Sequence, residues 1–151
     1  ISFKTDPQST DYVIEADAST ASYPLAAAAA VGGRVRVVGL GLDSSQSDIR
    51  FVDVLRDMGC VVVADGDDVV VERSGVLRGV DVDMKEFSDT APTLAALSAL
   101  AGTPTRITGI GFIRGKESDR ISDVVAELRK CGACHANDQT SRSFNGTSLA
   151  A

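Results

Sequence analysis

The residues best suited to chemistry lie in one charged segment, residues 114–120, which reads RGKESDR. Arg114, Lys116 and Arg120 place three cations between the expected end of a strand and the expected start of a helix. The free amide groups and the dipole of a helix N-terminus both favour anions. This segment is therefore predicted to bind a carboxylate or a phosphate.

Two side chains of this segment could take part directly in a reaction. Glu117 lies among cations and could donate or accept a proton, and Arg120 offers a carboxylate two parallel hydrogen bonds. The alternative is a solvated charged loop in which Ser118 or Asp119 caps the following helix.

Asp89 is a further candidate, because it stands just before a predicted apolar helix at residues 91–101. Capping of that helix is an equally good explanation for an aspartate at this position. The internal repeat described below nevertheless places Asp89 and residues 114–120 at the ends of elements of one unit. Both are therefore expected to face the same cleft.

Residues 131–135, CGACH, match the C-x-x-C-H pattern of covalent haem attachment, with His135 as the iron ligand. The chain has one histidine, both methionines precede the motif, and no export signal is recognisable. We therefore interpret Cys131 and Cys134 as small apolar residues at the end of a helix that Gly132 terminates. A single histidine also excludes the usual two-histidine zinc patterns, so no metal site is predicted.

The composition is that of one ordinary globular domain, with 151 residues, 44% hydrophobic and 24% charged. The net charge of -6 disfavours nucleic acid and anionic membranes as partners. The longest apolar stretch, residues 23–31, is too short to span a bilayer, so no membrane partner and a cytoplasmic location are expected. Because the chain begins with Ile1, we expect it to be a piece of a longer protein.

An internal repeat determines the expected architecture. Residues 25–41 read LAAAAAVGGRVRVVGLG, and residues 94–111 echo them roughly 70 positions later. Helical and strand periodicities alternate within each copy, and Asp48 is a plausible N-cap for the second helix of the first copy. The first unit is predicted to contain strands at 12–16, 34–39, 60–64 and 69–73 and helices at 22–31 and 48–58; the second contains strands at 80–84 and 105–108 and helices at 91–101 and 119–131.

The repeat pattern stops after the second helix of the second unit. Residues 136–151 contain one aromatic residue and no run of β-branched residues, so a disordered or loosely docked tail is predicted. We therefore expect one complete unit at residues 1–79, a truncated unit at 80–135, and the tail. Stacked units bury their apolar faces against neighbours, so a helix face around residues 26–30 should seek a partner, such as a second copy in a homodimer.

These segments together resemble the 5-enolpyruvylshikimate-3-phosphate synthase family. The resemblance rests on residues 15–23 (EADASTASY), 45–59, 84–89 and 114–120, and it covers residues 12–133 in the family's order. It implies an α+β fold of tandem β-α-β-α-β-β units, an inside-out barrel-like arrangement in which three units form each of two domains. This chain would be part of the second domain, with the active site in the cleft between the domains.

The resemblance also implies a reaction. The family moves the enolpyruvyl group of phosphoenolpyruvate to the 5-hydroxyl of shikimate 3-phosphate and releases phosphate, without a metal or organic cofactor. Asp89 matches the aspartate that contacts the ring hydroxyls and is a candidate base, and Lys116 matches a lysine near the 5-hydroxyl. Glu117 matches a glutamate close to the methylene carbon that gains and loses a proton, and Arg120 an arginine that binds the phosphoenolpyruvate carboxylate.

Some positions depart from the family pattern. Phe112 stands where some members carry a polar residue near the shikimate phosphate. Residues 44–46, Ser-Ser-Gln, imitate a ligand-binding turn of the other domain, but their flank favours a pseudo-symmetric turn without ligand. Because the first domain is absent, the isolated chain is predicted to be catalytically silent. Two alternatives stay open: a noncatalytic stand-alone module for assembly or anion binding, and part of an enolpyruvyl transferase that acts on a UDP-sugar.

Overall fold

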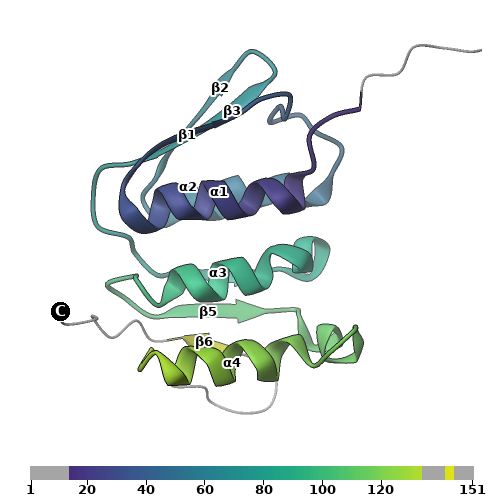
Figure 1. Cartoon of the computed structure of the whole chain (residues 1–151), viewed down its shortest axis with the longest axis vertical. Helices are drawn as coiled ribbons and strands as arrows, with labels where there is room; N and C mark the ends of the chain where they lie inside the picture. Colours follow the sequence, from purple (N-terminus) through teal and green to yellow (C-terminus); the bar gives the residue numbers. More distant parts are fainter. Residues whose placement is uncertain (1–13, 134–141, 145–151) are drawn as a thin grey trace, which may run out of the picture.

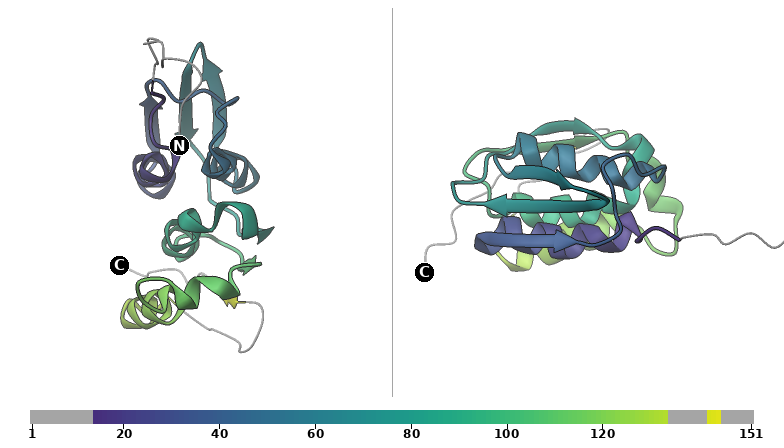
Figure 2. Two further views of the ribbon diagram at one scale, coloured as in Figure 1. Left: turned by 90° about the vertical axis from the view of Figure 1, so that its right-hand side faces the viewer. Right: turned by 90° about the horizontal axis from the view of Figure 1, so that it is seen from above.

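The computed structural model describes residues 14–133 and the backbone of residues 142–144. These residues form an α+β fold with two three-stranded sheets, each covered by helices on one face (Figures 1 and 2). The first sheet and its helices come from the first part of the chain, and the second sheet and its helices follow below them in Figure 1. The two parts share one continuous hydrophobic core.

The first sheet is antiparallel and has the order β1-β3-β2. Strands β2 and β3 form a hairpin around Gly66, which adopts a positive φ of 63°. The central strand β3 buries three consecutive valines, Val69, Val70 and Val71, as a strand flanked on both sides does. The strand bounds are β1 Gly33–Val37, β2 Val61–Asp65 and β3 Asp68–Arg73.

Helix α1 (Ala18–Val31) covers this sheet together with the short helices η1 (Ser47–Arg50) and α2 (Phe51–Asp57). Asp17 caps α1 by accepting hydrogen bonds from the backbone N–H groups of Ser19 and Thr20 at 2.9 and 3.2 Å. At the other end Arg73 donates from Nη2 to the carbonyl oxygen of Ala30 at 2.9 Å, so the sheet also caps the helix C-terminus.

The second sheet has the order β4-β5-β6 and is mixed. Strand β4 (Asp81–Asp83) runs parallel to β5 (Thr105–Thr108), and β6 (Arg142–Phe144) is antiparallel to β5. Between these strands lie η2 (Lys85–Thr90), α3 (Ala91–Ser98), η3 (Gly111–Gly115) and α4 (Arg120–Lys130). Helix α4 buries Ile121, Val125 and Leu128 on one face, as its periodicity predicts.

The repeat is visible in the packing of its equivalent helices. Helices α1 and α3 contact each other, and the hydroxyl groups of Ser22 and Thr93 lie 3.3 Å apart in the buried interface. Predominantly apolar side chains of both helices also line an open hollow, which we call the α1–α3 groove. It is formed by Tyr23, Ala26, Ala27, Ala30, Pro92, Thr93, Ala96, Leu97 and Leu100.

Several details of the first unit differ from the sequence-based expectations. Helix α1 begins at Ala18, four residues before the expected start at residue 22. Residues 14–16 of the predicted strand 12–16 are not in a strand, although Ala16 still donates from its N–H to Gly39 at 2.9 Å; residues 12 and 13 lie outside the described residues. Asp48 does not cap a helix, because its buried carboxylate accepts a hydrogen bond from the Ser19 hydroxyl instead. The helix predicted at 48–58 is divided into η1 and α2.

The last part of the chain differs as well. Strand β6 lies inside the predicted tail, and it takes the place beside β5 that β3 takes beside β1. The remainder of the tail lies outside the described residues, as do Cys134 and His135 of the C-x-x-C-H motif. Within the motif, Cys131 is exposed and follows the end of α4.

Candidate functional site

Asp89 lies at the end of η2, in a segment that the first unit supports. Phe87 interrupts the helical geometry of η2 with φ −138° and ψ 45°, and its side chain is buried. The guanidinium group of Arg50, from η1, lies 4.9 Å from the centre of the Phe87 ring. Sequence reasoning missed this support, because no local pattern pairs a cation with a ring that lies so far along the chain.

Asp89 does not cap α3, which overturns the simpler explanation for this residue. The N-cap of α3 is Thr90, and no side chain makes a capping hydrogen bond there. The carboxylate of Asp89 instead accepts hydrogen bonds at one oxygen, Oδ1, from Lys116 Nζ at 2.5 Å and from Arg120 Nη1 at 3.0 Å. Two segments that are separate in the sequence thus meet at Asp89.

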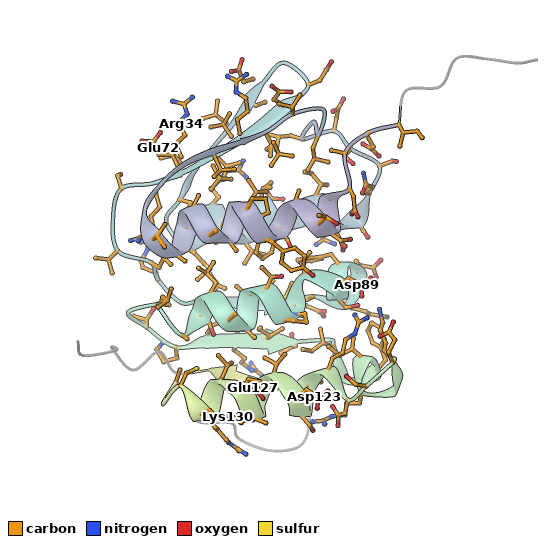
Figure 3. All side chains as sticks on the ribbon, in the orientation of Figure 1. Arg34, Glu72, Asp89, Asp123, Glu127 and Lys130 are labelled. Atoms are coloured by element: carbon orange, nitrogen blue, oxygen red, sulfur yellow. The ribbon has the colours of Figure 1, made fainter. Side chains whose placement is uncertain are left out.

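Glu117 completes this arrangement through Arg120. Its Oε2 accepts hydrogen bonds from Nε of Arg120 at 3.1 Å and from Nη2 at 2.6 Å. We call Asp89, Lys116, Glu117 and Arg120 the Asp89 cluster. Figure 3 shows Asp89 at the right-hand edge of the molecule, away from the Arg34–Glu72 ion pair of the first sheet at the upper left.

The ion pairs of the cluster shift the pKa values of its members. A hydrogen bond from Lys116 lowers the pKa of Asp89, and Arg120 lowers it further. The pKa of Glu117 is also lowered, first by a hydrogen bond from its own backbone N–H and then by Arg120. Both carboxylates are therefore ionised at neutral pH, and either could accept a proton only from a strongly polarised group.

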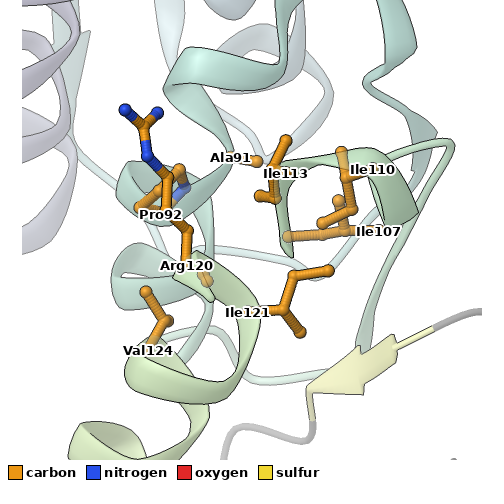
Figure 4. Close-up of a pocket in the computed structure, with 9 residues that line it drawn as sticks. Ala91, Pro92, Ile107, Ile110, Ile113, Arg120, Ile121 and Val124 are labelled. Atoms are coloured by element: carbon orange, nitrogen blue, oxygen red, sulfur yellow. The ribbon is translucent and has the colours of Figure 1, made fainter. Parts of the chain in front are cut away.

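Arg120 is held by apolar packing as well as by charge. It begins α4, and it borders a narrow apolar crevice between α3, β5 and α4 (Figure 4). In that view the guanidinium group points away from the side chains of Ile107 and Ile113, and the Arg120 side chain is 28% exposed. Burying the methylene stem while the charged end stays accessible is the usual arrangement for an arginine that meets an anion.

The third cation of the segment lies elsewhere. Arg114 was expected beside Lys116 and Arg120, but it donates from Nη1 to Asp119 Oδ2 at 2.6 Å and to Ser122 Oγ at 2.9 Å. Asp119 is the N-cap of α4, as one of the two sequence interpretations predicted. Hydrogen bonds, first from the backbone N–H of Ser122, lower the pKa of Asp119 to about 2.

Both ends of the Gln46 side-chain amide bind the backbone at the start of α1. Its Oε1 accepts from the N–H of Ala18 at 2.8 Å, and its Nε2 donates to the carbonyl oxygen of Ala16 at 2.8 Å. This use of Gln46 agrees with a structural turn at residues 44–46. Phe112, in η3, is exposed.

The described residues were expected to hold no metal ion and to cross no membrane. Among the described residues, no group of three or more histidine, cysteine, aspartate or glutamate side chains is placed to hold a metal ion. Within the same residues, no helix combines the length and the apolar character that crossing a bilayer requires.

Comparison with known proteins gives a consistent result. The family model for EPSP synthase (3-phosphoshikimate 1-carboxyvinyltransferase) matches residues 2–147. The 3-phosphoshikimate 1-carboxyvinyltransferase of Methanoculleus marisnigri is 51% identical over 123 residues, which are 82% of this chain and 29% of that protein. The enzyme of the same name from Serratia proteamaculans is 49% identical over 123 residues, 82% of this chain and 28% of that protein. The chain thus spans less than a third of the length of these relatives.

Solved structures agree with the sequence relatives. An EPSP synthase from Acinetobacter baumannii superimposes with a TM-score of 0.66 at 25% identity, covering 86% of this chain and 32% of that one. The enolpyruvyl transferase NikO from Streptomyces tendae superimposes with a TM-score of 0.64 at 26% identity, covering 88% of this chain and 31% of that one. With the family model matched across residues 2–147, the chain belongs to the EPSP synthase family.

Proposed function

We propose that this chain contributes one wall of the active site of a 3-phosphoshikimate 1-carboxyvinyltransferase. The reaction moves the enolpyruvyl group of phosphoenolpyruvate to the 5-hydroxyl of shikimate 3-phosphate and releases phosphate. The observation that carries the proposal is the meeting of Asp89 with Lys116 and Arg120, residues from separate segments, at one accessible edge. Membership of the family and about 50% identity to relatives of that name support it.

Each member of the Asp89 cluster has a chemical role that fits its surroundings. Asp89 binds the ring hydroxyls and is the candidate base for the 5-hydroxyl, and Lys116 stabilises the negative charge that develops there. Arg120 binds the carboxylate of phosphoenolpyruvate through its planar fork. Glu117, at the exposed side of Arg120, exchanges the proton of the methylene carbon. Because its pKa is lowered in the chain alone, Glu117 must take up a proton before the addition step and takes it back in the elimination step.

These roles need no metal or organic cofactor, since acid, base and electrostatic groups suffice for the addition and elimination steps. The chain alone would be inactive, because the matched residues are 29% of the relative's length and the groups facing the cluster would come from the remaining residues of such a protein. The loss of one electrostatic donor costs about 100-fold or more in rate, and several would be missing.

The division into units also belongs to this proposal. We assign residues 1–79 to one unit and 80–135 to a second, as the repeat suggests. Of the expected tail 136–151, strand β6 belongs to the second sheet through its pairing with β5. A homodimer and a cytoplasmic location stay predictions.

A chimera tests the function directly. Residues 14–133 would replace the aligned residues of the Methanoculleus marisnigri relative, and phosphate release would be measured with both substrates. The chimera should turn over, Asp89→Asn should lower kcat by about 100-fold or more, and Arg120→Lys should mainly raise KM for phosphoenolpyruvate.

Arg106→Lys is the matched control, because Arg106 also forms an exposed ion pair with an aspartate, Asp81, but lies on β5 outside the cluster. It should leave both constants within about twofold of the chimera. A folded chimera without turnover, or one indifferent to Asp89→Asn, would overturn the proposal. Turnover with a UDP-sugar in place of shikimate 3-phosphate would instead support the alternative function, an enolpyruvyl transferase that acts on a UDP-sugar.

A further inference from the structure

Arg114 is the one cation of residues 114–120 that the proposed reaction leaves unused. Its side chain does not contact the Asp89 cluster; it connects the start of the loop 114–119 to the first turn of α4. A single nitrogen, Nη1, donates to Asp119 Oδ2 at 2.6 Å and to Ser122 Oγ at 2.9 Å. Asp119 additionally accepts from the N–H of Ser122 at 3.0 Å and from its hydroxyl at 2.8 Å. The three side chains form one closed hydrogen-bonded group, which we call the Arg114 latch.

The Arg114 latch spans the loop that carries Lys116 and Glu117. Buried isoleucines anchor the chain on both sides, Ile113 in η3 and Ile121 in α4. Between these anchors few backbone hydrogen bonds hold the loop: the N–H of Lys116 reaches the carbonyl of Ile113 at a long 3.4 Å, and the N–H of Arg120 donates to the carbonyl of Ser118 at 2.9 Å. Side-chain links must therefore determine where this loop lies.

The geometry points to Arg114 as a positioning residue for the Asp89 cluster. By holding Asp119 and Ser122, it fixes the path of residues 115–118 and so keeps the ammonium group of Lys116 against Asp89. The assignment of the cluster to catalysis rests on the proposed function, whereas the positioning itself is a property of this chain. The latch is an exposed ion pair, with side-chain exposures of 36% and 38%, and such pairs contribute little to global stability.

Breaking the Arg114 latch is thus expected to change the pKa of Asp89 while the chain stays folded. Asp89 faces cations from two elements, Lys116 from the loop and Arg120 from α4, while Glu117 faces Arg120. If Lys116 loses its position, the pKa of Asp89 should move up towards its ordinary value, because its first stabilising hydrogen bond is weakened. The midpoint of urea unfolding at pH 7 should hardly change.

Carbon-13 NMR of the Asp89 carboxyl group across a pH titration measures this in the chain as it is. Arg114→Gln should shift the Asp89 titration to higher pH, and Arg114→Lys, which keeps the charge and one donor nitrogen, should restore most of the difference. Arg114→Gln also removes a cation, and this alone would raise the pKa of Asp89. The Arg114→Gln result by itself therefore does not demonstrate positioning.

Asp119→Asn distinguishes loss of positioning from the direct electrostatic effect of a removed charge, because the two change the pKa of Asp89 in opposite directions. Asparagine retains the helix cap but weakens the charged link to Arg114. Loss of an anion would by itself lower the pKa of Asp89, whereas loss of the latch raises it. A rise with both Arg114→Gln and Asp119→Asn supports positioning. A fall, or no change, with Asp119→Asn overturns it.

Arg106→Gln is the control, because it removes an arginine from an exposed pair with Asp81 outside the loop. It should leave the Asp89 titration unchanged, and an equal shift with this variant would overturn the inference. The titration uses no substrate. Its failure would therefore leave the proposed enzyme activity standing, just as an inactive chimera would leave the latch standing.

Discussion

Asp89 illustrates how a residue's partners decide its role. In sequence it has the position of a helix cap, yet in the structure two cations take its carboxylate and α3 begins without a side-chain cap. Asp119 follows the opposite course, since it does cap α4 and also accepts from Arg114. The ionised form of both carboxylates is stabilised in the folded chain, which lowers their pKa values. Protonation at low pH therefore destabilises the fold.

We expect the free energy of unfolding to fall as the pH drops from about 5 towards 2. The folded pKa values of Asp89, Glu117 and Asp119 lie below their ordinary values, to about 2 for Asp119. The unfolded chain therefore binds more protons in this range, and stability that is fully present above the unfolded pKa is lost as the pH falls through the folded pKa. Urea unfolding midpoints at pH 6, 4.5 and 3 measure the effect.

Asp119→Asn should flatten the lowest part of this pH profile, because an asparagine does not titrate. The carboxyl groups of Glu15 and Asp17, whose pKa values are also lowered, should keep the rest of the slope. A wild-type midpoint that is constant from pH 6 to pH 3 would contradict the prediction.

The sequence predicted the members of the candidate site better than their contacts. Asp89, Lys116, Glu117 and Arg120, the four candidates from the sequence, lie together in the structure; charged residues at the ends of repeated elements stand out by type and position. Their roles stay predictions. The separate place of Arg114 was not predicted. An arginine can reach in several directions, and only the folded loop decides which acceptor is nearest.

At the scale of elements, the segment between β3 and β4 joins the two units by backbone hydrogen bonds. Arg78 donates from its N–H to the carbonyl of Met58 at 2.9 Å, and Gly102 donates to that of Leu77 at 2.9 Å. Gly79 lies where this segment passes the turn before β5, and its N–H donates to Thr103 Oγ1 at 2.8 Å. The approach leaves no room for a side chain.

Gly79→Ala should lower the free energy of unfolding by about 1–3 kcal/mol, the usual cost of overpacking. A Cβ at this position would collide with the backbone carbonyl groups of Thr103 and Pro104, which cannot turn aside as a flexible side chain can. Gly75→Ala is the control, because nothing lies within 4 Å of its Cβ, and it should change stability by less than about 0.5 kcal/mol. Urea unfolding of both variants at pH 7 measures the difference; equal stabilities would contradict the prediction.

Element type was predictable where local periodicity is strong. The stripe of Ile121, Val125 and Leu128 and the alternation around β5 reflect backbone geometry alone, and α4 and β5 lie where they were expected. The predicted strand at residues 12–16 depended on pairing, and of its described residues Ala16 makes one such hydrogen bond, to Gly39. Strand β6 was missed because its pairing with β5, rather than its composition, makes it a strand.

At the scale of the whole molecule, the α1–α3 groove is the surface that the packing leaves open. The sequence predicted an unpartnered apolar face around residues 26–30, and Ala26, Ala27 and Ala30 do line the groove. Tyr23 and Leu100 stand at its border with exposures of 64% and 44%. Apolar surface of this kind favours association when the concentration is high enough.

We expect the isolated chain to self-associate reversibly through this groove, as a homodimer in the simplest case. Ala27→Glu should weaken the association by at least about 10-fold, because it places a charge on apolar surface, while the fold tolerates it at an exposed position. Val63→Glu is the control, because Val63 lies on β2 away from the groove and is 48% exposed. It adds the same charge and should leave the association unchanged. Sedimentation velocity over a range of concentrations measures both. A chain that stays monomeric throughout would contradict the prediction.

The pairing within the Asp89 cluster also affects how a ligand arrives. Its two cations and two anions sum to no net charge, and the chain as a whole carries a charge of -6. Beyond a Debye length of about 10 Å at 0.1 M salt, the cluster exerts little attraction on an approaching anion. These residues therefore attract an anionic ligand only at short range and do not steer its approach. They would confer little salt dependence on the rate of ligand association. If the proposed function holds, long-range capture of the anionic substrates would have to come from positive charge outside this cluster.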